Sequence, residues 1–197
     1  MIIVFGGSFN PPTMAHLQLA KLVLREHGVS KVVWIPVGDN YDKPDLVSCR
    51  HRLAMCNRLV EEESQMCLSD IECNGNLPKG SYHTLNALQK QVGEEPLVFL
   101  VGTDHLLTLP KWIEADRLLQ QFKIWIVPRP GYPVDYNVKN HPFFSLYQEQ
   151  LRFLTHFPQL HMSASEVRTQ IATGVYPKGL VHPRVWEYIS QEGLYGV

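Results

Sequence analysis

Residues 2–16 read IIVFGGSFNPPTMAH, an apolar run that ends in two glycines and leads through two prolines into a helix-like pattern. Residues 2–5 are apolar at consecutive positions, which is typical of a strand covered on both faces. Pro11 and Pro12 keep the chain out of the helical region until about Thr13. A strand, a turn with glycines and a helix in this order predict the first unit of a parallel sheet.

Further apolar runs follow the same pattern and occupy residues 31–36, 97–101 and 123–127. Segments with helical periodicity separate these runs, at about 13–27, 49–63, 82–92 and 112–121. Strands that alternate with helices predict the α/β class, and within it a Rossmann-like, doubly wound parallel sheet.

The C-terminal third has a different pattern, with predicted helices at 163–173 and 183–192 that end at Gly174 and Gly193. We expect these helices to form a small helical cap, about residues 159–197, at one edge of the sheet. The stretch 128–142 contains four prolines and is predicted to be a long loop. With 197 residues, the whole chain is expected to form one domain, 1–197.

Charge and hydropathy exclude several classes of function. The 18 Lys and Arg residues against 19 Asp and Glu residues give a net charge of -1, which does not indicate a domain-wide basic face for nucleic acid. No stretch approaches the roughly 20 apolar residues of a membrane span, and the N-terminal residues lack a basic leader. We therefore expect a cytoplasmic protein without nucleic-acid or membrane partners, and the sequence leaves its oligomeric state open.

The four cysteines do not form a recognisable metal or redox motif. Cys49, Cys56, Cys67 and Cys73 contain no C-x-x-C pair and no zinc-ligand spacing. We expect reduced, mostly buried thiols and no metal site built from protein side chains.

The turn after the first strand has the properties of a phosphate site. His16 falls in the first helical turn, where its side chain leans back toward unpaired backbone N–H groups and the positive end of the helix dipole. Gly6 and Gly7 let a large anion approach the backbone. From spacing alone, an ordinary strand-to-helix turn with a histidine cap is an equal alternative. The turn is neither G-x-G-x-x-G nor a P-loop, which disfavours dinucleotide-binding oxidoreductases and P-loop NTPases.

Two segments carry a resemblance to a known superfamily. GSFNPPTMAH at 7–16 resembles the G-x-F-x-P-x-[HT]-x-x-H signature of nucleotidyltransferases that transfer adenylyl or cytidylyl groups. Thr13 and Ala15 depart from the H-x-G-H form of many members, and the threonine resembles the eukaryotic-type nicotinamide mononucleotide adenylyltransferases. MSASEVR at 162–168 resembles the second phosphate-binding motif of that superfamily, although Ser163 and Glu166 also fit a helix capping box.

The middle of the chain resembles one family more closely. SYHTL at 81–85, GTDHLL at 102–107 and VPRPGY at 127–132 are similar to segments of bacterial nicotinate mononucleotide adenylyltransferases. This resemblance implies adenylyl transfer from ATP to nicotinate mononucleotide, which gives deamido-NAD and pyrophosphate in NAD biosynthesis. It also implies a Mg²⁺ ion carried by the ATP phosphates.

The resemblance further implies the residues of the site, with His16 and Arg168 as the catalytic pair. For ATP it implies Gly6, Gly7, Ser8, Phe9, Thr13, His16, Gly102, Asp104, Ser163, Ser165 and Arg168. For the mononucleotide it implies Ser8, Phe9, Lys43, Tyr82, Thr84, Trp112 and Arg129. In these sets Asp104 holds the adenosine ribose, Trp112 stacks on the pyridine ring, and Lys43 and Arg129 meet the mononucleotide phosphate. Packing of a helix on the sheet is an equally open role for Trp112, and Arg50 is expected to be surface charge.

Three alternatives for the function stay open at this point. Nicotinamide mononucleotide could be the preferred acceptor, as Thr13 suggests, whereas backbone N–H groups of the loop 104–112 would suit the acid. Another adenylyl- or cytidylyltransferase of the same fold, for instance one acting on phosphopantetheine, is the second alternative. The third is a non-catalytic nucleotide-binding module, which the departures at Thr13 and Ala15 would allow.

Overall fold

The computed structural model describes residues 1–41, 43, 45–74, 77–134, 141–160 and 164–197. Its centre is a six-stranded sheet with the order β3-β2-β1-β4-β5-β6, in which every pair of neighbouring strands is parallel. The strands are β1 (Ile2–Gly7), β2 (Lys31–Pro36), β3 (Met66–Leu68), β4 (Leu97–Gly102), β5 (Lys123–Val127) and β6 (Leu151–Phe153). This order is that of a doubly wound, Rossmann-like sheet and confirms the predicted fold class.

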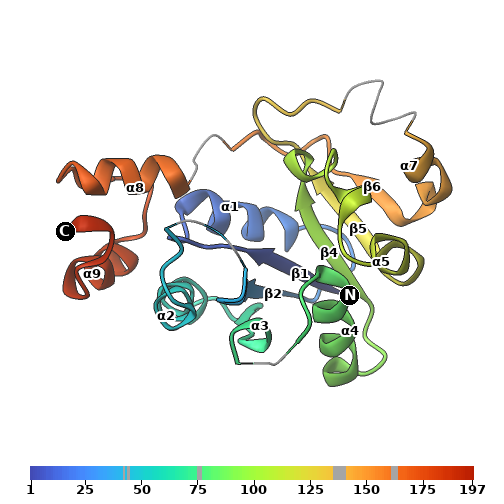
Figure 1. The fold of residues 1–197 in the computed structure, drawn as a ribbon, viewed down its shortest axis with the longest axis horizontal. Helices are drawn as coiled ribbons and strands as arrows, with labels where there is room; N and C mark the ends of the chain where they lie inside the picture. The colour runs from blue at the N-terminus through green and yellow to red at the C-terminus, as the bar shows by residue number, and fades with distance from the viewer. Residues whose placement is uncertain (42, 44, 75–76, 135–140, 161–163) are drawn as a thin grey trace.

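Helices cover both faces of the sheet (Figure 1). The apolar cluster on one side of the sheet contains residues of α1 (Met14–Val23), α2 (Cys49–Val60), α8 (Ala164–Ala172) and α9 (Pro183–Gln191). The other face packs against α3 (Ile71–Asn74), α4 (Ser81–Val92), α5 (Ala115–Gln121) and α7 (Pro142–Leu146). Short 3₁₀ turns complete the described chain: η1 (Thr103–His105), η2 (Leu109–Lys111), η3 (Gln148–Gln150) and η4 (Leu194–Gly196).

The central strand β1 shows why the apolar runs are continuous. Ile3 and Phe5 belong to the apolar cluster on the α1 face, while Ile2 and Val4 belong to the cluster on the α4 face. Successive side chains of a strand point to opposite faces, so a strand covered on both sides needs an apolar residue at every position. Burying each such side chain contributes about 1.5–3 kcal/mol, which explains why these runs become the middle of the sheet.

The C-terminal cap packs on the end of the α1 face that holds α2. Helix α9 contacts α2, and η4 contacts α8. The cap also reaches the turn before α1, because Tyr195 donates its hydroxyl to Asn10 Oδ1 at 2.7 Å and Leu180 accepts from the Met14 amide at 2.8 Å. Figure 1 shows α8 and α9 at the end of the molecule opposite α5 and α7. The cap thus lies on α2, which itself packs on the edge strand β3, and on the N-terminal turn.

The expectation of four reduced thiols is wrong for one pair. Cys49 and Cys73 form a disulfide, while Cys56 and Cys67 are free. The sequence gives no signal for this pairing because its cysteines are 24 positions apart and belong to no motif. The fold creates the pair by placing α3 beside the end of β2, next to the start of α2.

No helix within the described ranges is long and apolar enough to cross a membrane. In the predicted loop 128–142, residues 135–140 lie outside the described residues, and Pro142 begins α7.

Candidate active site

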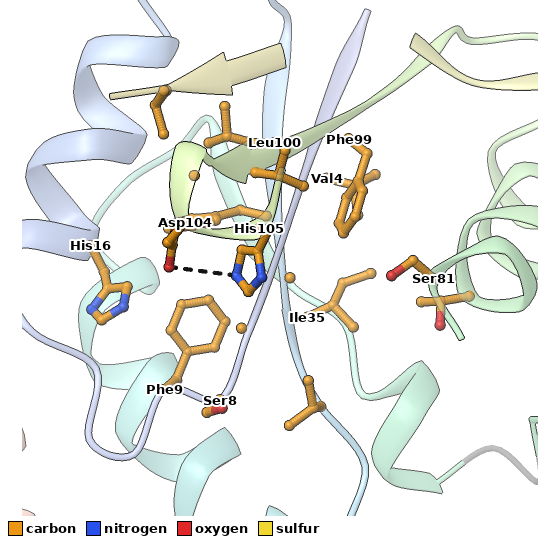
Figure 2. Close-up of a pocket in the computed structure, with 18 of the residues that line it drawn as sticks. Val4, Ser8, Phe9, His16, Ile35, Ser81, Phe99, Leu100, Asp104 and His105 are labelled. Carbon is orange, nitrogen blue, oxygen red and sulfur yellow. Dashed lines mark ion pairs between the residues drawn. The ribbon is translucent and has the colours of Figure 1, made fainter. Parts of the chain in front are cut away.

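A pocket of about 650 Å³ opens at the carboxyl ends of β1 and β4, within the range that small-molecule sites occupy. The two strands are neighbours, but β1 leads into α1 on one face and β4 leads toward α5 on the other. Ligands of doubly wound sheets bind at such a switch point. Figure 2 shows the pocket with His16 and Ser81 on opposite sides. The predicted residues that line it are Gly6, Gly7, Ser8, Phe9, His16, Lys43, Thr84, Gly102, Asp104, Trp112, Arg129 and Ser165.

His16 is held in one orientation by the start of its own helix. Its Nδ1 atom accepts a hydrogen bond from the Thr13 backbone N–H at 3.0 Å and lies 2.8 Å from the Thr13 hydroxyl. A backbone N–H can only donate, so Nδ1 of the neutral ring carries no proton and Nε2 carries it. His16 therefore presents an N–H donor to a ligand in the pocket.

Packing around the ring keeps His16 neutral in the free protein. The rings of Phe5 and Phe9 lie with their centroids 6.0 Å and 5.2 Å from the imidazole. Burial, with a further contribution from the positive charge of Arg129, lowers the pKa of His16 to about 4. At neutral pH the His16 imidazole is therefore uncharged and can donate its N–H to a phosphate.

We predict that His16 titrates near pH 4 in the free protein, well below the value of about 6.5 for an unperturbed histidine. The pKa is lowered because burial penalises the charged imidazolium, so the ring loses its proton at a lower pH than an exposed histidine does. An NMR pH titration of the imidazole signals measures this value, with the signal assigned by its loss in His16→Asn. A titration midpoint at or above 6.5 in the folded protein would contradict this description of the site.

The end of β4 forms a second polar corner, made of Gly102, Asp104 and Arg129. A Cβ atom at Gly102 would overlap the Asp104 carboxylate and come within 2.7 Å of Arg129 Cγ, so any other residue there would displace these two side chains. Asp104 Oδ1 is buried without a hydrogen bond from the described residues, and Arg129 Nε lies 3.7 Å away. Its other oxygen, Oδ2, lies 3.9 Å from His105 Nε2. A dashed line marks this pair in Figure 2. This carboxylate is a hydrogen-bond acceptor placed for the hydroxyl groups of a ligand.

Lys43 reaches the pocket as the resemblance implies. Its Nζ donates to Ser8 Oγ at 2.7 Å, which ties the loop after β2 to the turn after β1. Partial burial and the nearby Arg52 charge lower the pKa of Lys43. Among the described lining residues, four cationic side chains (Lys43, Lys79, Lys111 and Arg129) stand against two carboxylates (Glu72 and Asp104), so the pocket attracts anions.

Trp112 and Thr84 form the wall near α4. Trp112 is half-buried, its Nε1 donates to Thr108 Oγ1 at 3.3 Å, and it packs edge-on against Phe99 and His105. It therefore both packs on the sheet and lines the pocket. The Thr84 hydroxyl donates to Glu72 Oε1 at 2.7 Å.

The structure does not bring every predicted residue to the pocket wall, as far as the described residues outline it. Tyr82 is buried in the apolar cluster on the α4 face, where the Arg117 guanidinium stacks on its ring and donates to its hydroxyl. Thr13 is fully buried and holds His16. Arg168 donates to the Asn10 carbonyl at 2.8 Å from the side of α8. Ser163 lies outside the described residues.

Glu72 is a pocket residue that the sequence reasoning missed. Its Oε1 accepts from the Thr84 hydroxyl, and its Oε2 accepts from the Gly38 amide at 3.2 Å. Burial is the main cause that raises the pKa of this carboxyl group. A single Glu in a four-residue helix gives no sequence signal, because only the fold places α3 against the pocket.

Arg52 opens the helix after Lys43 together with Arg50, and the sequence does not predict its structural role, which is to connect two loops that border the pocket. Its side chain is 0% exposed. Its guanidinium donates to the carbonyl groups of Ser8, Val37 and Val47, and to Asp39 Oδ1 at 2.7 Å. It thus joins the turn after β1 to the loop after β2, the two segments that Lys43 and Ser8 also connect.

The loop after β4 uses several of its own backbone donors. The amides of Leu106, Thr108, Lys111 and Trp112 donate to carbonyl groups within the turns η1 and η2 and the residues between them. The sequence suggests that N–H groups of this loop bind the carboxylate of the acid, but these four already donate to backbone carbonyl groups.

Comparisons with known proteins found a matching family and related sequences. The model of the cytidylyltransferase-like family matches residues 4–170. A probable nicotinate-nucleotide adenylyltransferase of Acholeplasma laidlawii is 32% identical over 99% of this chain and 97% of its own length. One of Bacteroides fragilis is 30% identical over 96% of this chain and 90% of its own length.

Solved structures share the fold. Nicotinic acid mononucleotide adenylyltransferase of Plasmodium falciparum, complexed with NaAD, superposes with a TM-score of 0.81 at 20% identity, covering 98% of this chain and 96% of that one. A second structure of the Plasmodium falciparum enzyme, complexed with APC, superposes with a TM-score of 0.78 over the same shares of both chains.

Proposed function

Because the chain belongs to the cytidylyltransferase-like family, we propose that it transfers the adenylyl group of ATP to nicotinate mononucleotide. The products are deamido-NAD and pyrophosphate, and the reaction belongs to NAD biosynthesis. The observation that carries this proposal is the neutral His16, whose Nδ1 accepts from the Thr13 backbone N–H, so that its Nε2–H is left as a donor in a pocket of about 650 Å³. In this proposal the enzyme works in the cytoplasm, because it consumes ATP and a free mononucleotide.

The reaction needs positioning and charge stabilisation more than proton transfer. A phosphate oxygen of the mononucleotide attacks the α-phosphorus of ATP, a new P–O bond forms, and the bond from that phosphorus to the bridging oxygen of pyrophosphate breaks. The attacking oxygen is already ionised near neutral pH, so no general base is required. The barrier lies in bringing two anions together and in the charge that grows on the leaving pyrophosphate.

The residues at the start of α1 stabilise the charge that grows on the leaving pyrophosphate. His16 donates Nε2–H to the triphosphate, and the N-terminus of α1 adds its partial positive charge. The negative charge of a bound triphosphate raises the pKa of the imidazole and strengthens this hydrogen bond. Arg168 donates to the Asn10 carbonyl from α8 and so supports the N-terminal turn. It does not line the described pocket, so its role at the phosphates is proposed from the motif alone.

A Mg²⁺ ion on the ATP phosphates fits the residues that are present. The described residues contain no group of three or more His, Cys, Asp or Glu side chains that could hold a metal. Magnesium that keeps its waters and binds through substrate phosphates needs few protein ligands. Bound in this way, it would neutralise part of the phosphate charge, while His16 and the helix N-terminus orient the chain of phosphates.

The charge of the pocket favours the acid over the amide as acceptor. Four cationic side chains against two carboxylates line the described pocket, and nicotinate mononucleotide carries one negative charge more than nicotinamide mononucleotide. In this proposal Lys43 and Arg129 meet the mononucleotide phosphate, Trp112 stacks on the pyridine ring, and Asp104 accepts from the adenosine ribose.

We predict that Trp112→Ala raises the KM for nicotinate mononucleotide about tenfold, because an aromatic stacking contact is lost. The kcat value and the KM for ATP should change much less, since the ring is remote from the phosphates. Trp112→Phe keeps an aromatic face and should stay near the wild-type KM. Steady-state kinetics with varied mononucleotide measures this difference, and an unchanged KM in Trp112→Ala would return this residue to a packing role.

Product analysis tests the proposal and separates its alternatives. Purified protein with ATP and Mg²⁺ is offered nicotinate mononucleotide, nicotinamide mononucleotide or phosphopantetheine, and the products are separated by chromatography. We expect deamido-NAD with the first acceptor and a lower kcat/KM with the second. A higher kcat/KM with the amide would change the substrate, product only with phosphopantetheine would change the reaction, and no product would leave a nucleotide-binding module.

A further inference from the structure

The disulfide Cys49–Cys73 lies directly behind the pocket wall. Cys49 is the first residue of α2, and Cys73 belongs to α3, beside the pocket residue Glu72. Helix α3 has only four residues, so its position depends on tertiary contacts with the rest of the protein.

The α2 end of this disulfide is firmly anchored. The Cys49 amide donates to both Asp39 carboxylate oxygens, at 2.7 Å and 3.0 Å, and Arg52 donates to the same carboxylate. Arg52 Nη2 also lies 3.1 Å from Cys49 Sγ. After reduction, the helix N-terminus and this guanidinium would stabilise a Cys49 thiolate, which makes it a good leaving and attacking group.

The α3 end connects the disulfide to two walls of the pocket. Glu72 accepts from the Gly38 amide at 3.2 Å and from the Thr84 hydroxyl at 2.7 Å. The backbone of α3 also packs closely on Gly38, because a Cβ atom there would lie 2.6 Å from the Glu72 carbonyl oxygen. A shift of α3 therefore changes the loop after β2 and the first turn of α4 together.

We propose that Cys49 and Cys73 are a reversible modification site that exchanges with low-molecular-weight thiols and disulfides, and that it controls mononucleotide affinity through Glu72. The proposal rests on the proposed function only for the identity of the ligand whose affinity changes. With the disulfide closed, α3 is fixed and Glu72 holds both walls. With the disulfide open, the anchored Cys49 stays in place and α3 is released.

The exchange balances without a further reactant. The thiolate of a small thiol attacks the sulfur of Cys73, the more exposed residue of the pair, so that a mixed disulfide forms and Cys49 leaves as a thiolate. A second small thiolate attacks the mixed disulfide, which releases Cys73 and the small disulfide. Two small thiols are oxidised, one protein disulfide is reduced, and the reverse sequence closes it again.

The remaining cysteines serve as internal controls. Cys56 is fully buried and Cys67 is half-buried, and burial raises the pKa of both thiols. Neither forms a disulfide, and Cys67 lies on β3, away from the pocket-lining residues. Cys67→Ser should therefore keep both redox states of the Cys49–Cys73 pair.

The test prepares the full-length protein with oxidised glutathione and, separately, with an excess of reduced glutathione. Thiol counting after denaturation should give two free thiols in the first sample and four in the second. We expect reduction to raise the KM for nicotinate mononucleotide about threefold to tenfold, the size of one or two weakened hydrogen bonds, with the KM for ATP within about twofold. Cys73→Ser should show the raised KM in both samples, and Cys67→Ser should behave as wild type.

Two results would overturn the proposal: four reactive thiols in the oxidised sample, or the same mononucleotide KM in both redox states and in Cys73→Ser. If no acceptor gives product in either state, the proposed function fails and amide hydrogen exchange decides the coupling. Faster exchange at residues 71–74 and 81–84 on reduction supports it, and unchanged exchange there overturns it.

Discussion

Replacing His16 by alanine is expected to lower kcat by about 10²–10³-fold, the range for loss of one donor that stabilises transition-state charge. His16 faces the pocket as a neutral N–H donor because Thr13 occupies its other nitrogen. The charge that it meets grows as pyrophosphate leaves, so the interaction is stronger in the transition state than with bound ATP. The KM for the mononucleotide should therefore change little.

The matched control is His27→Ala, which removes an exposed histidine just beyond the other end of α1. This variant should keep the wild-type kcat, and thermal unfolding should show that both variants are folded. Steady-state kinetics with saturating ATP and mononucleotide makes the comparison. A kcat for His16→Ala within about twofold of wild type would remove this residue from the mechanism.

Arg52→Met is expected to have the largest effect on stability, a loss of about 3–5 kcal/mol in the free energy of unfolding. The side chain is fully buried, and its loss leaves the carbonyl groups of Ser8, Val37 and Val47 without their donor. These acceptors are partly buried. Each costs up to about 1–3 kcal/mol where it stays unpaired and water does not replace the lost donor. The methionine fills most of the volume, so the effect reports on the lost polar contacts.

Arg50→Met provides the comparison, because Arg50 is the exposed neighbour in the first turn of α2. It should change the free energy of unfolding by less than about 0.5 kcal/mol. Urea denaturation of the two variants beside wild type measures the difference. Equal stability of Arg52→Met and wild type would mean that the buried guanidinium does not hold the two loops together.

The sequence predicts the sheet because its four longest strands are buried on both faces. Strands β3 and β6 were not predicted, since each has three residues and pairs with one neighbour only. Helix α1 was predicted to residue 27 but ends at Val23, because residues 24–27 continue as turns toward Gly28 with φ of +80°. Short edge strands such as β3 and β6 form because a neighbouring strand pairs with them. The local sequence pattern carries no information about that neighbour.

The residues of the site also fall into those that the sequence predicts and those that depend on the assembled fold. The pocket brings together residues of the turns after β1 and β4, where motif and topology coincide, and their roles stay predictions. Glu72 and the structural role of Arg52 were missed since charged residues are ordinarily exposed, and only the assembled fold gives them partners. Tyr82 was placed in the site by resemblance, but its ring points into the core under Arg117.

Following the phosphorus atoms of ATP tests the central claim most directly. ATP labelled at the α-phosphorus is incubated with Mg²⁺, nicotinate mononucleotide and the protein, in parallel with ATP labelled at the γ-phosphorus. We predict that the α-label appears in deamido-NAD and that the γ-label appears only in pyrophosphate. Release of the γ-label as orthophosphate, or its transfer to the acceptor, would contradict adenylyl transfer, and so would the absence of any labelled product.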